Sequence, residues 1–152
     1  MAQPTPATSL IAALHARYEA TQTEYAAVER ADMAPRPKER GNKPDALDYG
    51  TALLTSEHES DALRNAILYQ VPDSWSDALI LQYHIGCAYD LCSCAAKPNE
   101  QDNERLQVAI DTLFDFMCTE VRTDAGEIGP GFAYGAARAF RLRRLRTGVV
   151  EA

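Results

Sequence analysis

Apolar residues recur at helical spacing along most of the chain, and this pattern predicts an all-helical fold. The clearest helix follows Thr8 and Ser9, either of which can cap it, and extends to about Asp32. Its apolar positions are three and four residues apart and form a heptad-like seam, with Thr21 in one polar slot. The seam consists of Ile11, Leu14, Tyr18, Tyr25 and Val28.

The most apolar stretch is Trp75–Ala96, which we expect to form the central helix and which contains three of the four cysteines. Pro72 separates it from the preceding helix, because proline lacks an amide hydrogen and biases Val71 away from helical dihedral angles. Asp73 or Ser74 can then cap the new helix. The pattern therefore predicts two consecutive helices joined by a sharp turn.

A second helix is predicted from about Ser56 to Gln70. Ser56 and Glu59 fit a capping box at its start. The segment Tyr49–Leu54 either extends this helix backwards or forms a separate turn, and the pattern leaves both choices open. The inner face of the helix contains Leu63, Ala66, Ile67 and Gln70.

A fourth helix is predicted from the Asn99–Asp102 region, where acidic residues suit a helix N-terminus, to near Asp124. Two apolar residues, Val108 and Phe116, lie off its inner face and present surplus apolar surface. The inner face itself contains Leu106, Ala109, Ile110, Leu113, Phe114, Met117 and Val121.

The remaining segments connect or flank these helices within a single domain, 1–152. Residues 1–8 are expected to form a frayed leader, and the proline and charge of 33–50 favour a solvated linker over a functional loop. Residues 126–152 begin as a glycine-rich turn and end as an arginine-rich tail, in which Ala136–Arg146 can form a short helix. The fold class predicted is an all-α antiparallel bundle of three to four main helices with this short C-terminal helix.

Charge is distributed unevenly along the chain, whose formal net charge is −7. Residues 1–125 carry a net −10 and residues 126–152 a net +3, so only the tail could attract an anionic partner. The start of the chain has no basic region ahead of its short apolar run, and no stretch is long and apolar enough to span a membrane. We therefore expect a cytoplasmic protein, away from membranes, whose cysteines stay reduced.

The central helix places His84 on the side opposite a polar stripe, so this histidine faces the predicted core. One interpretation makes His84 part of a metal site with Cys87, three residues later, and Cys118 from the fourth helix. The other, which we favour, treats the cysteines as core residues and His84 as a buried imidazole bonded to Asp77 or to a neighbouring tyrosine. The polar stripe, assigned to solvent or to a small-residue helix crossing, contains Gln82, Gly86, Asp90, Ser93 and Lys97.

Motifs that bind cofactors are missing from the sequence. No histidine follows a glutamate by three residues, as it does in the di-iron sites of helical bundles. The glycines at Gly129–Gly131 lack the preceding strand and the following lysine of a phosphate-binding loop. We therefore expect no cofactor and no catalytic residues, and we favour a non-enzymatic protein.

The arginine-rich tail has two interpretations. In the first, which we favour, it folds back on the acidic body and neutralises part of its charge. In the second, it binds an acidic protein, nucleic acid or an anionic surface. The arginines concerned are Arg138, Arg141, Arg143, Arg144 and Arg146.

The chain as a whole resembles a loose group of short, alanine-rich helical proteins of unknown function from bacterial genomes. The shared features are a long first helix at Ile11–Val28, a restart at Pro72–Trp75 and a further apolar helix at Ala78–Ala95. The resemblance implies a bacterial helical protein and brings no activity with it.

Association is the function that the pattern favours, foremost self-association as a homodimer. The heptad-like first helix and the surplus apolar surface at Val108 and Phe116 are the motive, because small helical bundles bury such surface by pairing. The first alternative is a regulatory module that contacts nucleic acid or an acidic partner through the arginine tail. The second alternative is a small metal- or ligand-binding bundle centred on His84 and Cys87.

Overall fold

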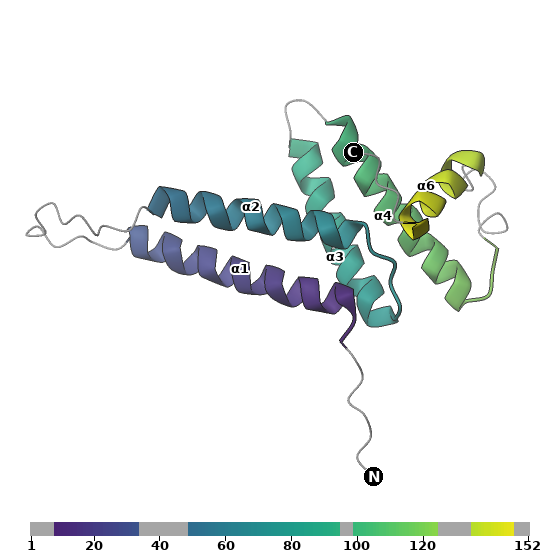
Figure 1. Cartoon of the computed structure of the whole chain (residues 1–152), viewed down its shortest axis with the longest axis horizontal. Helices are drawn as coiled ribbons and strands as arrows, with labels where there is room; N and C mark the ends of the chain where they lie inside the picture. The colour runs from purple at the N-terminus through teal and green to yellow at the C-terminus, as the bar shows by residue number, and fades with distance from the viewer. Residues whose placement is uncertain (1–7, 34–48, 95–98, 125–134, 148–152) are drawn as a thin grey trace, which may run out of the picture.

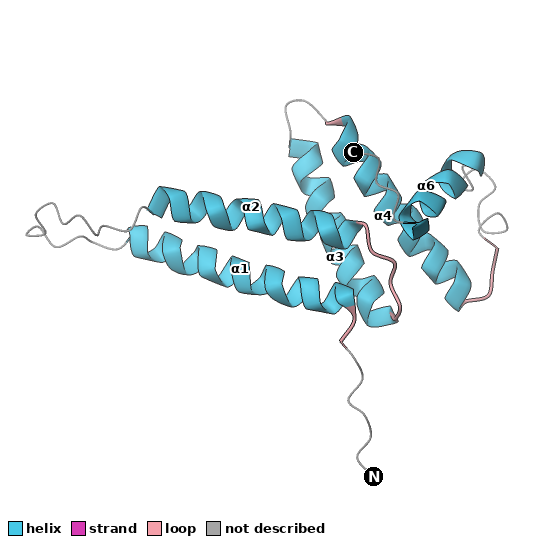
Figure 2. Cartoon of the chain, in the orientation of Figure 1, coloured by secondary structure: helices cyan, strands magenta, loops and turns pink. Residues whose placement is uncertain are grey.

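The computed structural model describes residues 8–33, 49–94, 99–124 and 135–147, and these ranges contain helices and no strand (Figures 1 and 2). The all-α prediction is therefore confirmed for the described residues. In the same ranges no helix is long and apolar enough to cross a membrane. The five helices are α1 (Leu10–Met33), α2 (Tyr49–Leu68), α3 (Trp75–Cys94), α4 (Glu100–Glu120) and α6 (Gly135–Thr147).

Side-chain caps define where three of the helices begin. The hydroxyl of Ser9 accepts a hydrogen bond from the amide of Ala12 at 3.1 Å, so Ser9 caps α1. Ser74 caps α3 in the same way through the amide of Asp77, also at 3.1 Å. The carboxamide oxygen of Asn99 accepts from an amide in the first turn of α4. These caps agree with the predicted starts.

Helix α2 differs from its prediction at the N-terminus. It begins at Tyr49, so the segment Tyr49–Leu54 extends the helix backwards. The predicted capping box at Ser56 and Glu59 is wrong, because the amides there lie inside a helix that has already started and find their acceptors one turn earlier. The hydroxyl of Thr55 likewise bonds to the carbonyl of Thr51 at 2.8 Å.

Helix α4 ends at Glu120, before the predicted end near Asp124. The cause is Arg122, whose φ of 55° lies in the left-handed region. The amide of Thr123 then bonds to the carbonyl of Cys118 at 2.9 Å, and that of Arg122 to the carbonyl of Thr119 at 3.2 Å. This pair of bonds is a Schellman motif, which usually has glycine in the left-handed position.

Several predictions concern residues outside the described ranges. They include the leader, most of the predicted linker (34–48), the end of the central helix with Lys97 (95–98) and the glycine-rich turn (125–134). The predicted short helix over Ala136–Arg146 is confirmed as α6.

Helices α1 and α2 lie side by side in antiparallel directions. The end of the pair formed by the C-terminus of α1 and the N-terminus of α2 points away from the other helices (Figure 1). Helix α3 contacts α1, α2 and α4. Among the described helices, α6 packs only on α4.

The main core lies where α2, α3 and α4 meet. Helix α1 joins it through Leu14 and buries its own seam, including Tyr18 and Thr21, as predicted. Two further expectations are wrong at the ends of helices, since Val121 lies exposed beyond the last turn of α4 and Gln70 lies beyond α2. The core residues are Ile67, Leu68, Ala78, Leu81, Ile85, Ala88, Leu106, Ala109 and Leu113.

The surplus apolar surface expected on α4 is covered within the chain. Val108 is buried, and Phe116 is partly buried with its ring 5.3 Å from that of Trp75. The reason is that α4 has two contact faces, one toward α2 and α3 and one toward α6. These residues therefore do not supply a surface for self-association.

Replacing Arg122 by glycine should stabilise the protein by about 0.5–1 kcal/mol, because glycine adopts the left-handed conformation without a Cβ penalty. Urea unfolding measures the change. Arg122→Ala retains the penalty and serves as the control. A destabilised glycine variant would contradict the assignment of strain to this position.

Candidate functional site

Two polar side chains of α3, Asp77 and His84, are buried and meet their partners on or just before α1. Nε2 of His84 lies 3.2 Å from Nδ1 of His15. A carboxylate oxygen of Asp77 accepts a hydrogen bond from the hydroxyl of Ser9, and the other accepts from the amide of Asp73 at 3.3 Å. The sequence led us to expect Asp77 or a tyrosine as the partner of His84, and the structure provides His15 instead.

The ring of His84 is surrounded by other rings, and we call His15, Tyr18, Tyr83 and His84 the histidine–tyrosine cluster. The ring centroids of Tyr18, Tyr83 and His15 lie 4.7, 5.1 and 5.3 Å from that of His84, all edge to face. Nδ1 of His84 is buried without a hydrogen-bond partner. A buried polar atom in this state costs free energy, so the site is held by the packing around it.

The protonation states of the cluster follow from its burial. Burial, together with the positive charges of His15 and Arg64, lowers the pKa of His84 to about 4, so its ring is neutral near pH 7. Burial and a hydrogen bond with Cys87 raise the pKa of Tyr83 to about 12. Neither group can gain or lose a proton readily near neutral pH. The buried imidazole of His84 therefore joins α3 to α1 as an uncharged ring.

The residues predicted as metal ligands are not assembled into a metal site. Cys87 lies one turn after His84 on α3 and is partly buried, while Cys118 is buried on α4. In the described ranges, no group of three or more histidine, cysteine, aspartate or glutamate side chains is arranged to hold a metal ion. All four cysteines are free thiols.

The arginines of α6 lie against acidic residues of α4. Asp111 is fully buried, and Nε and an Nη atom of Arg141 bond to one of its carboxylate oxygens at 2.8 and 2.5 Å. Arg138 and Arg146 both pair with Asp115, at 3.2 and 2.5 Å.

The two remaining arginines of α6, Arg143 and Arg144, make other contacts. Arg144 pairs with Glu104 at 3.3 Å, and Arg143 bonds to the carbonyl of Ala139 within its own helix. Helix α6, the described part of the tail, therefore folds back on the acidic body.

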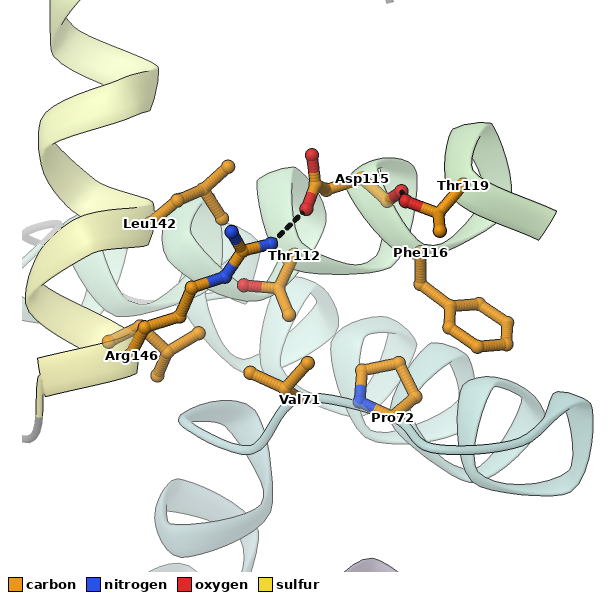
Figure 3. A pocket seen from close by; sticks show the side chains of 9 residues that line it. Val71, Pro72, Thr112, Asp115, Phe116, Thr119, Leu142 and Arg146 are labelled. Atoms are coloured by element: carbon orange, nitrogen blue, oxygen red, sulfur yellow. Dashed lines mark hydrogen bonds and ion pairs between the residues drawn. The ribbon is translucent and has the colours of Figure 1, made fainter. Parts of the chain in front are cut away.

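Helix α6 also covers a small hollow of about 160 Å³ above the turn between α2 and α3. Leu142 and Arg146 reach it from α6, Val71 and Pro72 come from the turn, and Phe116 comes from α4 (Figure 3). Most of this lining is apolar. We therefore interpret the hollow as a gap left where α6 packs on α4, and not as a ligand site.

The outward side of α3 presents exposed apolar side chains interleaved with a polar stripe. Trp75, Leu79 and Tyr83 follow one another at four-residue spacing, and the side chain of Leu79 is 70% exposed. Tyr89 is exposed on the same side, and a Cβ atom placed on Gly86 would have no atom within 4 Å. We call these five residues the α3 outer face. The predicted polar stripe is exposed here as expected at Gln82, Gly86, Asp90 and Ser93.

Sequence reasoning missed His15 and the aromatic part of the α3 outer face. His15 follows the seam residue Leu14 and precedes Tyr18 by three positions, so it lies at the flank of the seam, next to the neighbouring helix. The apolar character of the run around Tyr83 suggested that its side chains are buried. The four-residue spacing of Trp75, Leu79 and Tyr83 nevertheless allowed these three to form an outward row.

Acid should destabilise the fold through His84. Because the pKa of His84 is about 4 in the folded state and about 6.5 in the unfolded chain, unfolding takes up a proton between these values. The free energy of unfolding should fall by up to about 3 kcal/mol as the pH drops from 6.5 to 4. In urea titrations, His84→Gln should lose this part of the pH dependence and His58→Gln, at an exposed position, should retain it. Equal pH profiles for both variants would contradict the assignment.

Arg141→Ala should reduce the free energy of unfolding by about 3 kcal/mol, because Asp111 then keeps its hydrogen bond from Gln107 but is buried without its charged partner. Arg143→Ala, at an exposed position of the same helix, should cost less than about 0.5 kcal/mol. A double variant, Asp111→Leu with Arg141→Met, replaces both charges by apolar side chains and should recover most of the stability lost in Arg141→Ala. Urea unfolding distinguishes these outcomes, and equal effects of the two alanine variants would rule out this role of the pair.

Comparisons with known proteins provide no relative from which a function could be transferred. No known protein family matches this chain, and neither a curated protein nor a solved structure shows significant similarity to it. The contacts and exposed surfaces described above are therefore what a functional proposal depends on.

Proposed function

We propose that the protein acts by self-association and that two copies pack through the α3 outer face. The observation that carries this proposal is the exposed row of Trp75, Leu79 and Tyr83 with Gly86 and Tyr89 beside it. Exposed apolar rows of this kind are typical of interaction surfaces, and tryptophan and tyrosine are enriched in them. The seam of α1 is not available for this role, because α2 covers it.

The composition of α3 supports a second copy as the partner. Its only charged residues are Asp77, which is buried, and Asp90, so the face is almost uncharged in a chain of net charge −7. Charged residues are depleted at the centre of stable interfaces. An uncharged face also avoids repulsion between two acidic copies.

Gly86 gives the proposed interface its geometry. Because it lies near the middle of the outer face with open space above it, a second α3 can cross there with close backbone approach. A twofold axis through this crossing would place the same residues of both copies in contact. The face extends along about 30 Å of a single helix. One helix face of this length buries less area than the roughly 800 Å² per partner of a typical stable complex, so the dimer should be weak and reversible.

Sedimentation velocity over about 10–300 μM should show a reversible monomer–dimer equilibrium, a range suited to interfaces of this size. Leu79→Glu should abolish the dimer, since it places a charge within the apolar part of the contact. Leu54→Glu is the matched control, because Leu54 is an exposed leucine of α2 outside this face. A wild-type monomer throughout the range, or an unchanged dimer in Leu79→Glu, would refute the proposal.

Gly86→Leu tests the crossing itself. The new side chain meets open space in the single chain, so the helical content and thermal unfolding should be preserved. The dimer should dissociate at least about tenfold more readily, because the added side chain holds the two helices apart.

A further inference from the structure

A cavity of about 220 Å³ lies between α2, α3 and α4, away from the residues of the α3 outer face. Arg64 from α2 and Arg105 from α4 are both among the residues that line it. We propose that this cavity binds a small organic anion, a carboxylate with a compact apolar body, through Arg64 and Arg105.

The two arginines are deeply placed and incompletely paired. Their side chains are only 12% and 15% exposed. Each has one ion pair, through an Nη atom, with an aspartate one turn earlier in its own helix: Asp61 at 2.7 Å and Asp102 at 2.8 Å. Each also has a buried Nε atom without a hydrogen-bond partner. Two like charges beside one small cavity favour the binding of an anion.

The aspartates at the rim can give way to such an anion. The side chains of Asp61 and Asp102 are 60% and 44% exposed, so each can turn to solvent when a ligand carboxylate takes its guanidinium. Each aspartate is held through a single contact between an Nη atom and one carboxylate oxygen, whereas a planar guanidinium can bind a ligand carboxylate through two parallel hydrogen bonds. Asn65, which accepts from Arg105 at 3.1 Å, holds this arginine at the cavity.

The rest of the lining supplies an apolar surface for the body of the ligand. Leu68, Ala88 and Leu91 contribute it from α2 and α3. An apolar cavity of about 150 Å³ accommodates benzene, so the present cavity has room for one ring with a carboxylate attached. The thiol of Cys92 lines the same space and can report on its occupancy.

Benzoate is the probe, and its binding is followed by amide chemical shifts of the full chain below the concentration of self-association. We expect a Kd of about millimolar, as the small size of the probe implies. Benzyl alcohol keeps the ring without the charge, and inorganic phosphate keeps a charge without the ring. Both should bind at least about tenfold more weakly than benzoate. Equal binding of benzyl alcohol or of phosphate, or no binding of benzoate, would overturn the proposal.

Variants on both sides of the ion pair give opposite expected effects. Arg105→Gln should weaken benzoate at least about tenfold, whereas Asp102→Asn should tighten it severalfold, because it removes the competing carboxylate. Arg143→Gln, on α6, should have no effect. Unchanged or weakened binding in Asp102→Asn would overturn the proposal even if Arg105→Gln fails to fold.

Maleimide labelling provides a second measurement. Benzoate should slow the modification of Cys92 and leave that of Cys94, which is exposed and does not line the cavity, unchanged. Equal protection of both thiols would mean that benzoate acts outside the cavity and would refute the assignment. The result is independent of self-association, which involves other residues of α3.

Discussion

Buried polar side chains, more than apolar contacts, determine where α1 lies on α3. Asp77 and His84 are two turns apart on α3, and Ser9 and His15 meet them from the first turns of α1. A shift of α1 along α3 would leave two buried polar groups without partners, at about 1–3 kcal/mol each. Apolar surfaces alone distinguish such registers weakly. The position of α2 depends on this contact too, because α1 and α2 pack along most of their length.

The same principle acts at the other end of the molecule with full charges. Asp111 is buried on α4 and has Arg141 as its charged partner, so α6 must lie where that guanidinium can reach it. Moving α6 away would leave the carboxylate of Asp111 without its charged partner, at a cost in free energy. This cost disfavours the binding of an external anion by the arginines of α6. The central helices are thus joined by an apolar core, and the two peripheral helices are positioned by polar contacts.

The hydrophobic period was sufficient to predict the helices, the seam of α1 and the inward direction of His84, because these depend on which face of a helix is apolar. It was insufficient where the answer depends on a neighbouring element. His15 as the partner of His84, and the burial of Val108, follow from how α1 and α6 are placed. The start of α2 stayed open between two choices, because Asp48 before Tyr49 and Ser56 with Glu59 both resemble N-terminal caps, and the second pair lies inside the helix.

The antiparallel pair of α1 and α2 extends past the rest of the molecule (Figure 1). Its contacts with α3 and α4 come from the start of α1, at Ser9 and His15, and from the end of α2, at Ile67 and Leu68. Among the described residues, only α1 and α2 themselves contact each other at the opposite end of the pair. Amide hydrogen exchange would therefore report a gradient along both helices, with the distal turns opening in a separate step of lower free energy than global unfolding. Cooperativity in this chain is consequently divided between a compact unit and a projecting one.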